Sequence, residues 1–165
     1  MKIRILFVAL LMAVGQLYGI GQEAKPNFSG TWKLSGECST PKRGGNATLH
    51  IEQHGPELTV ETTVVKGSST SRHAVQHFRT DGKVSVTTGA DGDEFHTAIV
   101  WRDRTMVFSI EEHEDGRVLA SKEEWTLIEG GAALQRVRHP AHESTAPKEK
   151  QTLIYLKDVP LKDVP

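Results

Sequence analysis

The 165-residue sequence has little cysteine, few aromatic residues and almost no net charge. Cys38 is the only cysteine, so no internal disulfide can form. A lone thiol in an oxidising compartment is usually buried and inert, and less often bridges two molecules, so we expect Cys38 to be buried or idle.

The formal net charge is −1 and no basic block is present. This argues against nucleic acid as a partner, because such binding requires many phosphates to be neutralised.

Catalytic motifs are also missing. The sequence contains no Gly-x-Ser-x-Gly elbow, no His-Glu-x-x-His helix and no glycine-rich phosphate loop. Gly130 and Gly131 lie between two expected strands and therefore lack the helix N-terminus that binds phosphate. The acidic run at residues 111–115 approaches a hairpin tip, where we expect a solvated turn rather than a paired-carboxylate site. We predict no catalytic residue, no cofactor and no enzymatic activity.

Histidines, in contrast, are plentiful, and the sequence has eight. Along a strand, His50 and His54 would lie about 13 Å apart, too far for one ion to bridge, and the same holds for His73 and His77. A metal site would need a histidine from a neighbouring strand, such as His96 or His113. Because no sequence spacing sets that geometry, we expect solvated surface histidines and predict no metal site.

Long apolar runs are absent except at the start of the chain. Lys2 and Arg4 precede an apolar run at residues 5–14, and small residues follow at Gly19 and Gly21. This is the layout of a signal peptide, and the run is shorter than the roughly 20 residues of a spanning helix. We therefore expect residues 1–21 to be a signal peptide and the mature chain to be secreted or periplasmic, without a membrane anchor after cleavage.

The rest of the chain predicts one domain. About 140 residues can bury a core without disulfides or metals. We assign residues 22–157 to this domain and residues 158–165 to a disordered tail, because residues 161–165 only duplicate the pentapeptide at 156–160. The sequence carries no indication of the oligomeric state.

Apolar and polar residues alternate in short segments throughout this domain. Residues 94–102 are typical, since Phe95, Ile99 and Trp101 fall on one face of an extended chain. A loop rich in glycine and proline is expected at residues 37–46. The expected strands are residues 29–36, 47–54, 57–66, 71–79, 83–88, 94–102, 105–113, 117–128, 133–139 and 150–157.

Turn residues separate these segments. Asp81-Gly82 and Asp115-Gly116 are strong hairpin signals, because glycine readily takes the positive φ of tight turns. Turn signals recur about every 8 to 12 residues, and no helical periodicity follows the leader. The fold class predicted is all-β, an antiparallel up-and-down barrel of about ten strands. Two stacked sheets would show the same alternation.

Several short motifs carry a resemblance to known proteins. They are Phe28-Ser29-Gly30-Thr31-Trp32-Lys33-Leu34, Thr80-Asp81-Gly82-Lys83, Trp101 with Met106-Val107-Phe108, Glu124-Trp125-Thr126-Leu127 and Leu153-Ile154-Tyr155. The first resembles the opening strand of the lipocalin and fatty-acid-binding-protein group, whose Gly-x-Trp lies beneath the barrel floor. Over about 130 residues, the chain looks most like secreted bacterial lipocalin-like proteins. This resemblance implies a barrel that binds a small molecule.

Two departures from fatty-acid-binding proteins limit what the resemblance implies. Those proteins insert a pair of helices after the first strand, for which residues 37–46 are too few and too rich in glycine and proline. They also hold the ligand carboxylate with an Arg-x-Tyr in the last strand, where this chain has Leu153-Ile154-Tyr155. The tyrosine is present and the arginine is not, so the carboxylate clamp is not expected here.

Arginines on the penultimate strand are candidates for a polar anchor. Leu134, Arg136 and Arg138 share the face that alternation turns inward. An arginine inside a barrel either pairs with an anionic ligand or packs over an aromatic ring. The resemblance implies the second role, with Arg136 or Arg138 covering Trp32.

The predicted function is that of a carrier or sensor for a small, largely apolar ligand, because ten strands can enclose more space than their own side chains fill. The predicted ligand-binding residues are Trp32, Leu49, Val60, Phe78, Ile99, Trp101, Phe108, Trp125, Arg136, Arg138 and Tyr155. One alternative is an interaction or structural module with a filled barrel. A second is an isomerase or hydrolase that uses the cavity, which the fold permits but no residue demands.

Overall fold

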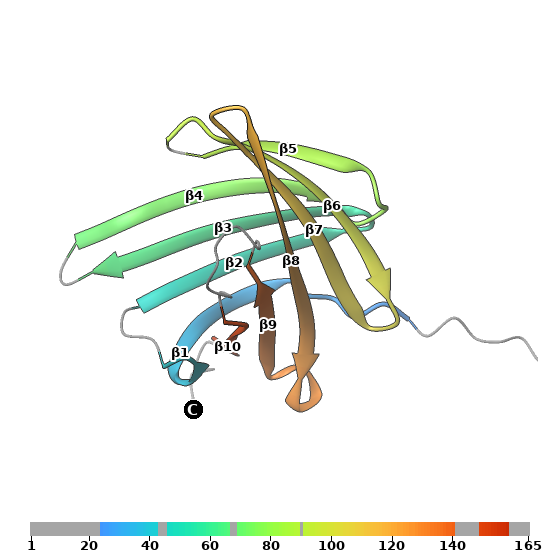
Figure 1. Cartoon of the computed structure of the whole chain (residues 1–165). Coiled ribbons are helices and arrows are strands. Elements are labelled where there is room, and N and C mark those ends of the chain that lie inside the picture. Colours follow the sequence, from blue (N-terminus) through green and yellow to red (C-terminus); the bar gives the residue numbers. More distant parts are fainter. Residues whose placement is uncertain (1–23, 43–45, 67–68, 90, 141–148, 159–165) are drawn as a thin grey trace, which may run out of the picture.

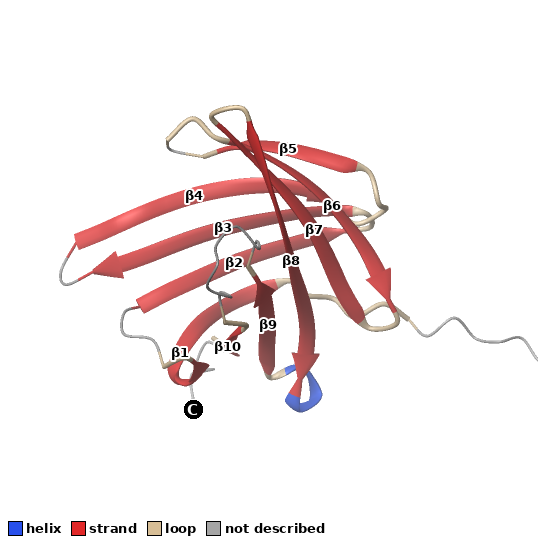
Figure 2. Cartoon of the chain, in the orientation of Figure 1, coloured by secondary structure: helices blue, strands red, loops and turns tan. Residues whose placement is uncertain are grey.

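The computed structural model describes residues 24–42, 46–66, 69–89, 91–140 and 149–158. The expected signal peptide lies outside this range, as does all of the expected tail except Asp158. The described strands are β1 (Gly30–Thr40), β2 (Asn46–His54), β3 (Glu57–Lys66), β4 (Ser69–Arg79), β5 (Val84–Thr88), β6 (Glu94–Arg102), β7 (Thr105–Glu114), β8 (Arg117–Ile128), β9 (Ala133–His139) and β10 (Gln151–Lys157). A 3₁₀ turn, η1 (Glu129–Gly131), joins β8 to β9 (Figure 2). Among the described residues, no helix is long and apolar enough to cross a membrane.

The strands form one antiparallel sheet that curls into a nearly closed up-and-down barrel (Figure 1). The order is β4-β3-β2-β1-β10-β9-β8-β7-β6-β5, so consecutive strands pair with one another except β4 and β5, and β10 returns to pair with β1. In Figure 1, β2, β3 and β4 run across the view, whereas β6, β7 and β8 run steeply down it. This confirms the predicted all-β barrel of about ten strands.

The barrel is open between β4 and β5, which are the two ends of the sheet. The sequence predicted a hairpin at Asp81-Gly82, and this prediction is wrong. The turn exists, but no ladder joins β4 to β5 among the described residues. Gly82 instead donates its N–H to the carbonyl of Ile99 on β6, at 2.9 Å. The turn therefore carries the chain across a gap rather than closing a strand pair.

β1 is longer than the sequence indicated. Residues 37–40 were expected in a loop, yet β1 runs to Thr40 with an irregularity in its register between Ser35 and Thr40. The buried Ser39 makes this possible, because its hydroxyl donates to the carbonyl of Ser35 at 2.7 Å and accepts from the N–H of Ile154 at 3.1 Å. Cys38 was expected to be buried or idle. It lies on this segment and is exposed, so it is not buried, and an idle thiol stays a prediction.

One apolar cluster lines the interior of the barrel. Its buried members are Phe28, Trp32, Leu49, Ile51, Leu58, Val60, Ile99, Met106, Phe108, Trp125, Leu134, Leu153 and Tyr155. Phe28 connects two of the predicted tryptophans, since its carbonyl accepts from the indole N–H of Trp32 at 2.9 Å and its ring lies 6.0 Å from that of Trp101. Both tryptophans therefore belong to the same interior.

Candidate functional site

A polar cluster lies inside the barrel on β8, β9 and β10. Alternation turns Glu123 and Trp125 of β8 inward, and the register places them directly opposite Arg138 and Arg136 of β9. Tyr155 of β10 completes the group and is buried. Three neighbouring strands thus bring one carboxylate and two guanidinium groups together beside two aromatic rings.

Glu123 connects both arginines. Its Oε1 lies 2.5 Å from Nε of Arg136, and its Oε2 lies 2.9 Å from Nε of Arg138. The indole N–H of Trp125 also donates to Oε1, at 2.7 Å. Both oxygens of a carboxylate that is 3% exposed are therefore satisfied by charged or polar donors, as a buried ion requires.

The two arginines differ in exposure. The side chain of Arg136 is 13% exposed, whereas that of Arg138 is 50% exposed. Arg136 is enclosed by the cluster, and its ion pair with Glu123 neutralises its charge there. Half of the Arg138 side chain is exposed, so another molecule can reach it.

The environment keeps Glu123 and Arg136 ionised. Burial by itself raises the pKa of Glu123, but the charges of Arg136 and Arg138 and the hydrogen bonds from Arg136 and Trp125 outweigh it, so the pKa lies below its ordinary value. Burial by itself lowers the pKa of Arg136, but the charge of Glu123 and contact with Tyr155 leave the pKa raised. Neither group is placed to exchange protons near neutral pH.

Arg136 also packs against aromatic rings. Its guanidinium carbon lies 4.5 Å from the ring centre of Trp125 and 5.6 Å from that of Tyr155. The expectation that Arg136 or Arg138 would cover Trp32 is wrong. Nζ of Lys157 lies over that ring instead, 5.2 Å from its centre, because β10 is the strand that pairs with β1.

A row of rings connects the polar cluster to the open side of the barrel. The Phe108 ring lies 4.7 Å from Trp125 and 6.1 Å, edge to face, from Phe78. Phe78 belongs to β4, which is one edge of the gap. The row therefore runs through the interior from β4 to the ion pairs.

The remaining predicted ligand-binding residues also face the interior. Leu49, Val60 and Ile99 are buried, and Trp101 is half-buried against the same apolar cluster. The structure thus gathers all eleven predicted residues in or against one interior. Whether they contact a ligand stays a prediction.

A pocket of about 230 Å³ opens beside the gap. It is lined by Glu57, Leu58, Thr59, His77, Phe78, Arg79 and Ser85. Leu58 and Phe78 reach it from the core, whereas Thr59 and His77 belong to the opposite face of the same strands. The pocket therefore lies at the edge of the sheet, where Leu58 and Phe78 of the apolar cluster form part of its lining.

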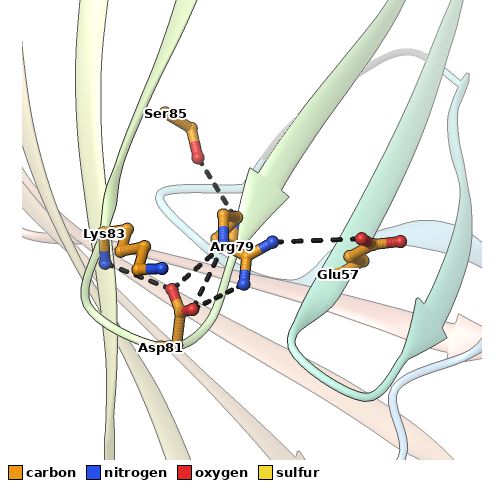
Figure 3. A network of polar contacts seen from close by, with 5 residues as sticks. All are labelled: Glu57, Arg79, Asp81, Lys83 and Ser85. Atoms are coloured by element: carbon orange, nitrogen blue, oxygen red, sulfur yellow. Dashed lines mark hydrogen bonds and ion pairs between the residues drawn. The ribbon is translucent and has the colours of Figure 1, made fainter.

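Polar contacts hold the chain at this edge (Figure 3). The guanidinium of Arg79 donates to Asp81 at 2.6 Å and lies 3.9 Å from Glu57, and its backbone N–H donates to the hydroxyl of Ser85 at 3.1 Å. Asp81 also accepts from the N–H of Lys83 at 3.3 Å. The hydrogen bond from Arg79 lowers the pKa of Asp81, and the same bond raises the pKa of Arg79. Side chains thus connect β4 to β5 where backbone pairing is missing.

Sequence reasoning missed Glu123. The signal was present, because Glu123 is two residues from Trp125 and four from Leu119 and Leu127, so alternation places it on the same face as these apolar residues. A charged residue at such a position indicates a buried ion pair, and the two inward arginines of β9 were its available partners. The pocket at the gap had no sequence signal, because it depends on β4 and β5 remaining apart.

Comparisons with known proteins agree with this architecture. No family model and no curated protein sequence matches the chain. Among solved structures, the REP1-NXSQ fatty acid transporter matches with a TM-score of 0.55 and 15% identity, over 81% of this chain and 97% of that one. The fatty-acid-binding protein 1 of Echinococcus granulosus matches with a TM-score of 0.55 and 14% identity, over 80% and 98%. The fold is that of the fatty-acid-binding-protein-like β-barrels.

A third match is secretory abundant heat soluble protein 4 of Ramazzottius varieornatus, with a TM-score of 0.58 and 12% identity, over 82% of this chain and 97% of that one. At these identities the likeness shows the fold alone.

The two departures from fatty-acid-binding proteins that the sequence indicated concern the β1–β2 connection and β10. β1 ends at Thr40 and β2 begins at Asn46, which leaves no room for a helix pair. On β10, Leu153 and Tyr155 are buried. Arg136 lies directly opposite Leu153 in the register of β9 and β10, and its guanidinium carbon lies 5.6 Å from the centre of the Tyr155 ring.

Proposed function

We propose that the chain is a secreted or periplasmic binding protein, a carrier or sensor that holds a small, largely apolar molecule inside its barrel. The aromatic row would contact the apolar part of the ligand, and Arg138 with Arg136 would anchor its polar end. The fatty acid transporter and the fatty-acid-binding protein among the structural matches support a ligand of this class.

The observation that carries the proposal is the unequal charge of the buried cluster. Two arginines share one glutamate, and arginine stays protonated in proteins. The cluster therefore holds one positive charge more than Glu123 neutralises, next to the Trp125 ring. An anionic or strongly dipolar group at the end of an apolar molecule would complement this excess charge, and Arg138 is the exposed side of it.

The gap between β4 and β5 is the proposed entrance. Small-molecule pockets usually measure roughly 300 to 1,000 Å³, so the pocket of about 230 Å³ is small. Phe78 lines this pocket and also contacts Phe108 of the aromatic row, so a rotation of the Phe78 side chain would extend the pocket toward that row. Entry at the gap breaks no backbone ladder among the described residues, since β4 and β5 are not paired.

The cluster fits anchoring better than acid–base catalysis. A general acid or base works best with a pKa near the working pH. The pKa of Glu123 is held below its ordinary value and that of Arg136 is raised, so both keep their charge at neutral pH. We therefore propose a non-enzymatic role for the interior.

Binding of a charged and an uncharged ligand of equal length tests the proposal. We would titrate the protein with decanoic acid and with decanol and follow tryptophan fluorescence. We expect saturable binding at one ligand per chain, with the acid bound at least fivefold more tightly than the alcohol. In an Arg138→Gln variant the preference for the acid should disappear. Failure of both compounds to bind saturably would refute the proposal.

One observation favours the filled-barrel alternative. The Phe78, Phe108 and Trp125 rings already contact one another in series, and this fills part of the interior. Native mass spectrometry of protein purified without detergent separates the two possibilities. A bound small molecule supports the carrier, whereas an unliganded mass together with no saturable titration supports the interaction module.

A further inference from the structure

The outer face of β6 and β7 carries a square of two histidines and two glutamates. In the register of these strands, Glu94 lies opposite His113 and His96 lies opposite Glu111. The two imidazoles thus occupy one diagonal of the square and the two carboxylates occupy the other. The adjacent pair, Thr97 opposite Ile110, points the other way, since Thr97 is buried and Ile110 packs against the core.

We propose that His96, Glu111 and His113 form a binding site for a divalent transition metal ion of the zinc type. Nitrogen and oxygen atoms of these three side chains lie within 4.8 Å of one another. Imidazole nitrogen and carboxylate oxygen are ordinary zinc ligands. A tetrahedral zinc ion holds its ligand atoms about 3.3 Å apart, so small side-chain rotations would complete the geometry.

Among the described residues, Nε2 of His113 makes no hydrogen bond that would compete with a metal ion. The His96 and His113 rings lie 4.2 Å apart, centre to centre, inclined at 33°. Nε2 of His113 is shielded from solvent and has no hydrogen-bond partner in the part of the chain that the structure describes. A carboxylate oxygen of Glu111 is 3.9 Å from this nitrogen, beyond hydrogen-bond distance. A bound cation would satisfy this nitrogen.

Glu94 would supply a fourth ligand or orient the ring of His96. Its Oε2 lies 3.5 Å from Nε2 of His96. Carboxylates beside metal-binding histidines commonly fix the orientation of the ring and strengthen binding. Both histidine side chains are about one-third exposed, so an ion can reach the site from solvent.

The spacing along each strand predicted solvated histidines, and the structure changes that interpretation for one pair. His96 and His113 are 17 positions apart in the chain and meet only because β6 and β7 pair in this register. The site lies on the outside of the barrel wall. Its existence is therefore independent of whether the interior binds a ligand.

Zinc titration of the full chain without a histidine tag tests the site. We would measure binding by isothermal titration calorimetry for the unmodified chain and for His96→Ala, His113→Ala and His50→Ala. His50 is the matched control, because it also lies on an outer face with a glutamate oxygen, from Glu52, 3.5 Å from its Nε2. Within the described part of the chain, His50 belongs to no group of three side chains that could hold a metal ion. Circular dichroism in the presence of EDTA would check that the variants fold.

We expect one zinc ion per chain, with binding weakened at least tenfold in His96→Ala and in His113→Ala and changed less than twofold in His50→Ala. Cobalt bound at the same site should show the visible absorption of tetrahedral coordination, and this absorption should be lost in His113→Ala. Equal affinities in the unmodified chain and the His113→Ala variant would overturn the proposal. So would an equal loss in the His50→Ala variant, or no zinc binding at all.

Discussion

Glu123 and Arg136 form an ion pair inside the barrel, with Oε1 of Glu123 2.5 Å from Nε of Arg136. The two residues come from adjacent strands, and Arg136 is at the same time stacked on Trp125. Removing one partner would leave the other charge buried without compensation, which is far more costly than losing an exposed pair.

Replacing Glu123 should therefore destabilise the protein strongly. We expect Glu123→Gln to lower the free energy of unfolding by about 3 kcal/mol, measured by urea denaturation. Glu124→Gln is the matched control, since Glu124 is the next residue, faces outward and pairs with Lys122 and Arg102 at the surface. Its cost should stay below about 1 kcal/mol. An equal loss of unfolding free energy in the two variants would show that the buried ion pair stabilises the fold no more than the surface pair does.

Stability should fall in acid because of the same residue. The pKa of Glu123 lies below its ordinary value of 4.5 in the folded state, so its contribution is complete above pH 4.5 and is lost as the pH falls through the folded pKa. The difference in unfolding free energy between the unmodified chain and Glu123→Gln should be constant above about pH 5 and shrink below pH 4.5. A difference that stays constant down to pH 3 would contradict the lowered pKa.

Phe78 should control access to the interior. Phe78→Ala would enlarge the pocket at the gap toward the Phe108 ring, so binding of an apolar fluorescent dye such as ANS should increase several-fold. The variant should also lose about 2 kcal/mol of stability, because a half-buried ring is removed from the core. Val75→Ala, on the exposed face of the same strand, should change neither quantity. Unchanged dye binding in Phe78→Ala would argue against an entrance at this point.

The edges of the gap should open more readily than the closed side of the barrel. Backbone amides of β5 have a ladder partner only on the β6 side, whereas β1 and β10 each pair on both sides. We expect hydrogen exchange to be roughly tenfold faster in β5 than in β10. Mass spectrometry of peptides covering residues 84–88 and 151–157 measures this, and equal protection would mean that the gap is closed in solution.

The sequence determined the architecture through short-range rules. Alternation of apolar and polar residues placed most strands within one or two residues of their observed bounds, and glycine turns separated them. The inward direction of Arg136 and Arg138 followed from the same alternation and is confirmed by their contacts with Glu123. These features are local, since each depends on a few consecutive residues.

Only the tertiary structure decided which residues meet. Asp81-Gly82 has the sequence of a hairpin, but β4 and β5 form the two ends of the curled sheet and make no backbone ladder with each other. The pocket lies beside the gap between them. Lys157 rather than an arginine covers Trp32, because β10 returns to β1. The ring contact of His96 with His113 depends on a register between strands, which no single segment encodes. The direction in which a side chain points thus follows from its own strand, whereas the residues that it contacts depend on how the strands pair and curve in the barrel.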